Sequence, residues 1–323
     1  ARVSQYDWRQ VDPAQARDQV RSLVAEVGQH PAVFGYYLKD EPCADEFPGL
    51  GTVASLVREY APGKWPYINL FPDYANARQL GAPSYQAHLD AFIQHCQPPI
   101  ISYDNYSLME REDVRPQYWT NLAAVSATAQ RHGVPFWNIV LTVAHFQYRE
   151  LTAADARFQA FTTLAYGGRG LSYFTYFAPQ IGNYRMAPVD QFGTETATWG
   201  YLQQVNRQIA QLSPTLAKLR FDTVYHYGSV PPGSRGPSGE DLVIGLDSGP
   251  FLVGEFTHDD GSRYALVVNK SFHDSHWVWA KTRLGSHALR LVSPYTGKLV
   301  PFTGEQQVLA PGQGSLLCLS PAP

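Results

Sequence analysis

The 323-residue sequence has few cysteines, few charged residues and no long apolar run. Its three cysteines, Cys43, Cys96 and Cys318, are widely spaced, so no zinc-binding spacing is present and at least one thiol must be free. Only 16% of the residues are charged, which argues against a disordered or coiled-coil chain. The net charge of −3 argues against a nucleic-acid binder, and no apolar run reaches the roughly 20 residues of a membrane-spanning helix.

Several signatures of cofactor and nucleophile chemistry are also missing. No glycine fingerprint for dinucleotides, no phosphate-binding loop and no Ser-His-Asp order stands out, and the histidines lack zinc spacing. We therefore expect neither a cofactor nor a metal ion. No secretory signal peptide is visible, and the chain begins at Ala1. The cellular location stays open, and a secreted or periplasmic one is favoured only if the protein acts on polysaccharide.

What the sequence does contain is a regular alternation of apolar runs and helical patterns. The first helix begins after Asp12 and Pro13 and ends near Gly28, and a compact apolar run follows at 33–38. Such alternation predicts a parallel sheet with helices packed outside it. The later strands are predicted over 67–71, 99–104, 136–143 and 171–177, and the later helices over 50–60, 84–95, 117–132, 152–166 and 198–219.

The pattern changes near residue 221. Short strand-like runs separated by glycine-containing turns predict an antiparallel β-sandwich of about 100 residues. We predict a shortened (β/α) barrel of about five βα units over 1–220 and a C-terminal β-sandwich over 221–323. The first domain is shorter than the roughly 250 residues of an eight-stranded barrel. An open cleft, a smaller closed barrel or a homo-oligomeric contact must therefore deal with the exposed sheet edge.

Polar residues at the carboxyl ends of barrel strands form the active site of such folds. Counting back by two from Glu41 puts Lys39 and Tyr37 on the same face, so Glu41 is expected to point into the barrel mouth. Asp104 shares a face with Ser102 two strands further on. Hydrolysis of a glycosidic bond needs a carboxylic acid to protonate the leaving oxygen and a second carboxylate as base or nucleophile. Glu41 and Asp104 are the predicted pair.

Each candidate also has a structural alternative. Glu41 could pair with Lys39 or cap the next helix, and Asp104 could bind a sugar hydroxyl or hold Tyr106 in place. The remaining candidates are predicted to bind substrate, although each of the aromatic and histidine side chains could equally belong to the core or the wall. They are Asp40, Tyr37, Asn69, Tyr103, Trp137, His145 and Tyr176.

The run Phe-Gly-Tyr-Tyr-Leu-Lys-Asp-Glu-Pro at 34–42 resembles the acid/base strand of the large glycoside hydrolase clan with (β/α)8 barrels, whose fourth strand ends Asn-Glu-Pro. The clan includes cellulases, β-galactosidases and mannanases. The resemblance implies a general acid/base role for Glu41 and places Asp40 where the clan holds a sugar hydroxyl. The strands at 102–106 and 170–176 look like those of a poorly characterised bacterial branch related to β-galactosidases, and the C-terminal sandwich resembles the small β domain that often follows such barrels.

Two features depart from the clan's pattern. Its nucleophilic Glu ends the seventh strand, whereas the corresponding run at 136–143 continues only to Ala144 and His145, and Glu150 comes five residues later. The second carboxylate is therefore Asp104, or Glu150 in reserve, or else the retaining mechanism of the clan is not used. In addition, only about 32 residues precede the strand of Glu41, too few for three βα units.

These observations favour a glycoside hydrolase that acts on a β-linked oligo- or polysaccharide of the β-glucan or β-galactoside class. The missing seventh-strand Glu supports an alternative, a carbohydrate-binding protein without catalysis on a barrel scaffold. A third interpretation is a fragment that works only with a partner chain supplying the missing strands. The composition predicts neither a nucleic-acid nor a membrane partner.

Overall fold

The structure is a computed structural model that describes residues 6–28, 30–111, 114–246, 249–285 and 288–320. Its contacts divide the chain into two compact units. The first unit combines Ala1–Asn105 with Ala124–Asn138, and the second combines Tyr106–Ala123 with Ile139–Pro323. The change to antiparallel strands comes at Leu219, where β6 begins. The domain boundary at 220/221 stays a prediction.

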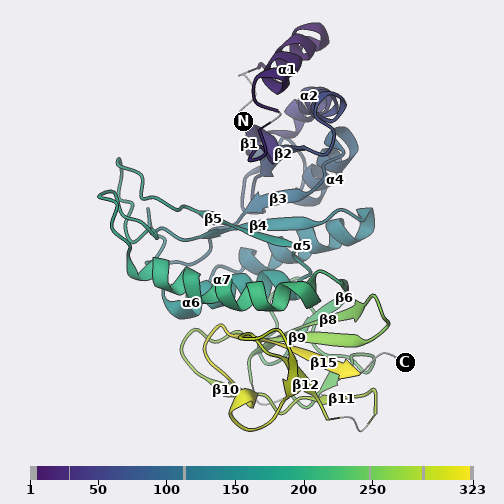
Figure 1. Cartoon of the computed structure of the whole chain (residues 1–323), viewed down its shortest axis with the longest axis vertical. Coiled ribbons are helices and arrows are strands. Elements are labelled where there is room, and N and C mark those ends of the chain that lie inside the picture. The colour runs from purple at the N-terminus through teal and green to yellow at the C-terminus, as the bar shows by residue number, and fades with distance from the viewer. Residues whose placement is uncertain (1–5, 29, 112–113, 247–248, 286–287, 321–323) are drawn as a thin grey trace. The chain divides into compact units, whose positions relative to one another are not determined.

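A five-stranded sheet in the order β1-β2-β3-β4-β5 forms the βα part of the chain (Figure 1). β1 pairs in parallel with β2, and β2 with β3, because each connection runs through a helix. The predicted shortened barrel of five βα units is confirmed. The elements are α1 (Pro13–Val27), β1 (Gly35–Asp40), η1 (Ala44–Glu46), α2 (Phe47–Tyr60), β2 (Trp65–Leu70), α3 (Ala77–Leu80), α4 (Tyr85–Cys96), β3 (Ile101–Asp104), α5 (Gln117–His132), β4 (Phe136–Leu141), α6 (Ala153–Ala165), β5 (Gly170–Phe174) and α7 (Ala197–Leu216).

The C-terminal strands form a six-stranded antiparallel sheet in the order β13-β12-β15-β9-β8-β6 and two small ladders, β10-β14 and β11-β7. Apolar side chains from the sheet and the ladders enclose one core, which includes Tyr225, Phe251, Val278 and Leu317. The predicted β-sandwich is therefore confirmed. Its elements are β6 (Leu219–His226), β7 (Val243–Ile244), β8 (Phe251–His258), β9 (Arg263–Asn269), β10 (His276–Trp277), β11 (Lys281–Thr282), β12 (Arg290–Val292), β13 (Leu299–Pro301), η2 (Gly304–Gln307), β14 (Val308–Leu309) and β15 (Gly314–Ser320).

Helix α6 packs directly on the six-stranded sheet, against β8, β9 and β15 (Figure 1). Two glycines of the sheet make this close approach possible. A Cβ atom on Gly254 would lie 2.0 Å from the carbonyl oxygen of Ala165, and one on Gly314 would lie 2.5 Å from the ring of Phe161. Almost every residue of α6 is buried as a result. This packing explains why α6 and the sandwich belong to the same compact unit.

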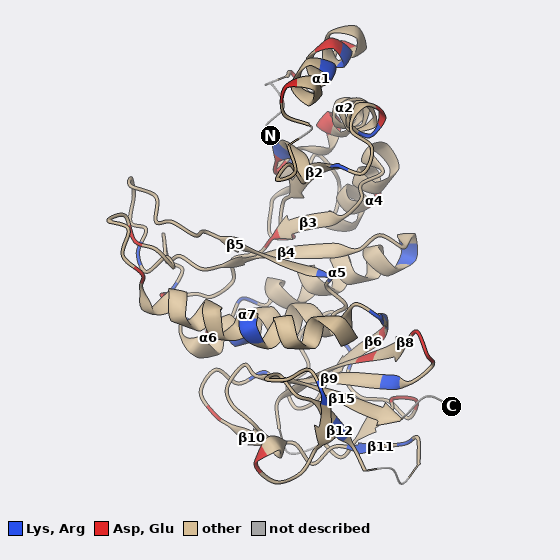
Figure 2. Cartoon of the chain, in the orientation of Figure 1, with Lys and Arg blue, Asp and Glu red and all other residues tan. Residues whose placement is uncertain are grey.

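The structure also shows the state of the cysteines and where the charged residues lie. All three cysteines are free thiols, Cys96 and Cys318 buried and Cys43 half-buried. Lys and Arg (blue) and Asp and Glu (red) are interspersed along the helices and loops of both units (Figure 2). Within the described ranges, no helix combines the length and the apolar character needed to cross a bilayer.

Candidate active site

The carboxyl ends of β1, β2 and β3 bring polar side chains of the first unit together. The parallel register pairs Asp40 with Asn69, and Asn69 with Ser102. Asp104 ends β3 two residues after Ser102, so both side chains lie on the same face of that strand. Glu41 follows β1 directly. The site thus consists of residues that neighbouring parallel strands place at one edge of the sheet.

Asn69 links two carboxylates. Its side chain is buried, and Nδ2 donates to Oδ1 of Asp40 at 3.0 Å and to Oδ1 of Asp104 at 2.7 Å. The amide oxygen of Asn69 accepts from Oγ of Ser102 at 3.0 Å. Oγ of Ser102 also lies 2.7 Å from the hydroxyl of Tyr67. Because Ser102 has a single hydroxyl hydrogen and uses it on Asn69, Tyr67 must donate to Ser102. This chain of donors fixes the amide so that its N–H groups face the carboxylates.

Glu41 adopts an unusual backbone conformation. Its φ angle is +45°, in the left-handed region that costs a non-glycine residue about 1–2 kcal/mol. The backbone N–H of Glu41 donates to the carbonyl of Asn69 at 2.8 Å and helps to hold this conformation. The register against β2 shifts between Tyr37 and Lys39, yet burial still alternates along β1, with Tyr36 and Leu38 buried and Tyr37 and Lys39 half-buried as the predicted alternation requires. Strained backbone of this kind is concentrated at functional sites.

Two carboxyl groups of the site resist ionisation. Burial, together with the negative charges of Asp104 and Asp40, raises the pKa of Glu41 to about 7. Burial also raises the pKa of Asp104 to about 7; the charge of Asp40 adds to this effect, whereas the hydrogen bond from Asn69 opposes it. Near neutral pH the pair can therefore hold a proton on one member and a negative charge on the other.

The structural roles considered for Glu41 are filled by a different carboxylate. Oε1 of Glu46 lies 3.6 Å from Nζ of Lys39, and Oε2 of Glu46 accepts from the backbone N–H of Cys43 at 3.0 Å, at the start of η1. Glu46, and not Glu41, therefore provides the ion pair with Lys39 and the cap of the next helical turn. The Glu41 carboxyl instead lies close enough to Asp104 and Asp40 for their charges to raise its pKa.

Three aromatic residues of the first unit, Tyr37, Tyr103 and Trp137, are predicted to bind substrate. The structure places them in three different surroundings. Tyr37 is half-buried, with its ring 5.9 Å from that of Tyr67, beside the donor chain. Tyr103 instead lies on the opposite face of β3 from Asp104, where its ring is fully buried and packs near Phe136. A ring enclosed in this way belongs to the core, so the assignment of Tyr103 to substrate binding is not supported.

Trp137 is also in a different place from the one predicted. Its ring packs 5.3 Å from that of Trp65, which in turn contacts Phe34. Trp65 is the first residue of β2 and Trp137 is the second of β4, so this aromatic cluster lies at the amino ends of the strands. The predicted strand at 136–143 likewise has Trp137 as its second residue, so its position in the run already placed it away from the carboxyl end where barrel sites form.

His145 belongs to the second unit and is surrounded by aromatic rings. It is buried, its Nδ1 lies 2.9 Å from the carbonyl of Val143, and the ring of Tyr184 stacks on it at 5.0 Å. Burial lowers the pKa of His145, and the charge of Arg185 adds to this effect. Whether His145 contacts substrate stays a prediction.

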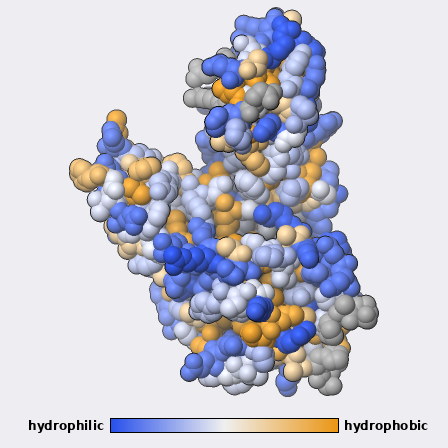
Figure 3. Space-filling view, viewed as in Figure 1, coloured by the Kyte–Doolittle hydropathy of each residue, from blue (hydrophilic) through white to orange (hydrophobic). Residues whose placement is uncertain are grey.

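The other candidates of the second unit lie in the loops after β4 and β5. Glu150 is half-exposed and pairs with Arg185 at 3.2 Å, and Arg185 also binds Glu110 at 2.7 Å. Tyr176 is half-exposed and contacts Trp199 edge-on. These loops, which extend to the left in Figure 1, carry apolar surface (Figure 3). Their most exposed apolar side chains are Phe146, Phe177, Ile181 and Phe192.

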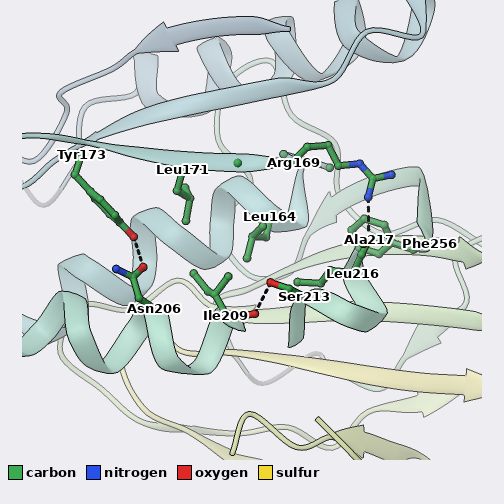
Figure 4. Close-up of a pocket in the computed structure, with 13 residues that line it drawn as sticks. Leu164, Arg169, Leu171, Tyr173, Asn206, Ile209, Ser213, Leu216, Ala217 and Phe256 are labelled. Carbon is green, nitrogen blue, oxygen red and sulfur yellow. Dashed lines mark hydrogen bonds between the residues drawn. The ribbon is translucent and has the colours of Figure 1, made fainter. Parts of the chain in front are cut away.

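A cavity of about 280 Å³ lies elsewhere in the second unit, between β5, α7 and β8 (Figure 4). Its wall is largely apolar, and its polar groups bind other parts of the same wall. Arg169 donates to the carbonyl of Leu216 at 2.9 Å, and the hydroxyl of Tyr173 donates to Asn206. The cavity starts at the amino end of β5, opposite to the end where barrel chemistry occurs. It is therefore a packing gap rather than a second candidate active site.

Sequence reasoning missed Tyr67 and Ser102 as parts of the site. Each lies two residues before a predicted site residue on the same strand, Tyr67 before Asn69 and Ser102 before Asp104. The period of two could therefore have identified both. No set of three or more His, Cys, Asp or Glu side chains is arranged to hold a metal ion in the part of the chain that the structure describes.

Comparison with protein-family models and with curated proteins finds no match. Solved structures with the same fold do match. A glycoside hydrolase family 5 protein from Bacteroides vulgatus ATCC 8482 is 14% identical with a TM-score of 0.54, over 95% of this chain and 66% of that one. A second glycoside hydrolase is 12% identical with a TM-score of 0.54, over 95% and 68% of the two chains.

A third similar structure is the GH27 β-L-arabinopyranosidase from Geobacillus stearothermophilus, which is 10% identical with a TM-score of 0.50, over 96% of this chain and 62% of that one. This chain therefore spans 62 to 68% of the length of the three structures. At such low identity the likeness concerns the fold. The fold is that of the barrel glycoside hydrolases, as the resemblance at 34–42 implied.

Proposed function

We propose that this protein is a glycoside hydrolase that cleaves a β-linked oligo- or polysaccharide with Glu41 and Asp104. One observation carries the proposal: two carboxyl groups with pKa values raised to about 7 lie at the carboxyl ends of strands in a barrel-type sheet. Glycosidic hydrolysis requires such a pair, one member protonated and the other ionised. The glycoside hydrolase fold supports the same class of reaction.

The surroundings of the two carboxyl groups assign their roles. The N–H of Asn69 points at Asp104 and stabilises its ionised form, whereas burial and two neighbouring negative charges favour the protonated form of Glu41. Glu41 would then donate its proton to the leaving glycosidic oxygen. Asp104 would attack the anomeric carbon or remove a proton from the attacking water. Asp40 would accept a hydrogen bond from a sugar hydroxyl.

The β-glucan or β-galactoside class of substrate is supported by the resemblance at 34–42. Tyr37 is the aromatic side chain best placed for a sugar, because it is half-buried and its ring lies beside that of Tyr67. The polysaccharide partner and a homo-oligomeric contact at the sheet edge remain predictions.

A carbohydrate-binding protein without catalysis is the second candidate. It is favoured by the end of β4, where the chain continues to the buried His145 instead of a Glu, and where Glu150 further along is paired with Arg185. This interpretation keeps a site for sugars but assigns no chemistry to Asp104.

The test is turnover of a panel of aryl β-glycosides and soluble β-glucans by the full chain. Glu41→Gln and Asp104→Asn should each lower kcat by about 10³-fold, within the range for loss of a general acid or base. The matched control is Glu59→Gln, a change at an exposed ion pair with Arg17, which should alter kcat less than about threefold. Normal turnover by both site variants would overturn the proposal, and oligosaccharide binding without any turnover would favour the second candidate.

A further inference from the structure

Two exposed tryptophans stand side by side on the C-terminal sandwich, in the second unit. Trp277 ends β10, and Trp279 follows two residues later. Val278 between them is fully buried in the sandwich core, and its N–H donates to the carbonyl of Gln307 at 2.7 Å. Because side chains alternate along an extended chain, the inward Val278 turns both indole rings to the outside. Trp277 is 47% exposed and Trp279 is 53% exposed.

The two indole rings form a parallel stack. Their centroids are 5.1 Å apart and their planes differ by only 5°. In this arrangement each ring covers part of one face of its neighbour, while about half of each residue stays exposed. The stack also fixes the orientation of both rings, so a ligand that lies on the open face does not have to immobilise them.

Polar side chains come just before the strand that pairs with Trp277. Trp277 pairs with Val308 in the β10-β14 ladder, and the preceding turn η2 carries the exposed side chains of Glu305 and Gln306. A flat apolar face next to carboxylate and amide groups suits a pyranose ring, which presents C–H groups on its face and hydroxyls at its edge. We propose that the Trp277–Trp279 stack binds a sugar unit of an oligo- or polysaccharide, as a second carbohydrate site on the sandwich.

The size of the surface favours a sugar over a protein partner. Half of two tryptophan side chains offers about 200 Å² of apolar surface, whereas a stable protein interface buries about 800 Å² on each partner. The choice of a carbohydrate as ligand rests on the proposed function, because a glycosidase that holds its polymer at a second point raises the local concentration of substrate.

Affinity electrophoresis through gels that contain soluble cellulose derivative, galactomannan or arabinogalactan tests this site. The protein is the full chain with Glu41→Gln, so that hydrolysis does not erase the gel matrix. Trp277→Ala and Trp279→Ala are added singly, and Tyr295→Ala is the matched control, because Tyr295 is an aromatic residue of the sandwich that is 80% exposed. Circular dichroism confirms that each variant is folded, and Trp277→Phe should restore part of the binding.

We expect at least one polysaccharide to retard the parent chain, and we expect each tryptophan variant to bind about tenfold more weakly, a change equivalent to 1.4 kcal/mol. Tyr295→Ala should migrate like the parent. Unchanged retardation of both tryptophan variants overturns the site. The site is also overturned if no polysaccharide retards the parent chain and sedimentation shows a dimer that the tryptophan variants abolish. If the wild-type chain hydrolyses nothing but retardation still depends on the tryptophans, this site stands and the proposed hydrolysis fails.

Discussion

Two buried aspartates, one in each unit, are held in opposite ways. Asp155 lies at the start of α6 and is fully buried, with Oδ1 2.6 Å from Nη2 of Arg149. Its other oxygen accepts from the backbone N–H and the hydroxyl of Thr152 at 2.8 and 2.9 Å. Asp104 at the end of β3 is also buried, yet its carboxyl accepts from the neutral amide of Asn69, and the charge of Asp40 nearby is negative.

This difference separates a structural carboxylate from a candidate reactive one. A buried charge is tolerated when a cation and several donors surround it, as at Asp155. At Asp104 burial and the nearby charge of Asp40 outweigh the hydrogen bonds to the carboxyl, so ionisation costs free energy and the pKa rises to about 7. Folding alone gains nothing from such an arrangement, whereas an acid/base pair that works near neutral pH depends on it.

Removal of Asp155 should have the larger effect on stability. Asp155→Ala leaves the partly buried guanidinium of Arg149 without its carboxylate and removes the acceptor for the backbone N–H and the hydroxyl of Thr152 in the capping box of α6. We expect a loss of about 3–5 kcal/mol in the free energy of unfolding, as for other broken buried pairs. Denaturant unfolding at pH 7 measures it. A loss below about 1 kcal/mol would contradict the structural role, whereas Asp18→Ala, at an exposed ion pair, should cost little.

Asp104→Asn should stabilise the fold, but only at high pH. In the unfolded chain Asp104 ionises near its ordinary pKa of about 4, and in the folded protein near 7. The folded state therefore loses stability as pH rises between these values, and the penalty is complete above pH 7. Replacement by Asn should remove about 2–4 kcal/mol of destabilisation at pH 8.

Thermal unfolding of the parent and the Asp104→Asn variant at pH 8 and pH 5 measures this difference. At pH 5 Asp104 is already protonated in the folded state, so the variant should gain much less there. An equal gain at both pH values, or a lower Tm at pH 8, would show that the buried charge of Asp104 is not the source of the instability.

Asn69→Ala should have the smallest effect of the three and should change the pH profile. The variant removes the donor that favours ionised Asp104, so the pKa of Asp104 should rise and the pH limb of kcat that follows this group should move to higher pH. We expect kcat to fall about 10- to 100-fold, in line with 1.5–3 kcal/mol for a hydrogen bond to a charged group. Ser102→Ala, which acts only through the Asn69 amide, is the control for an indirect effect. A fall in kcat without a shifted limb would assign Asn69 a purely structural role.

Local patterns in the sequence were sufficient to predict much of the fold. The alternation of apolar runs and helices gave the order of the five βα units, and Asp12 and Thr152 accept the hydrogen bonds expected of helix caps. Period-two spacing put Ser102 and Asp104 on one face, as the hydrogen bonds to Asn69 confirm. These features depend on neighbours within a few residues, so they can be read from the sequence.

Other features depend on residues that are distant in the sequence, and only the tertiary structure decided them. The shared amide of Asn69 requires three neighbouring strands in register, and the ion pair of Lys39 goes to Glu46 because η1 places that carboxylate nearby. Burial of the Tyr103 ring likewise depends on how the helices cover the sheet. By itself the sequence determined which residues carry acid, amide or aromatic groups and in what order. Which carboxylates are neutralised and which resist ionisation follows from long-range packing, because desolvation acts only when the chain is folded.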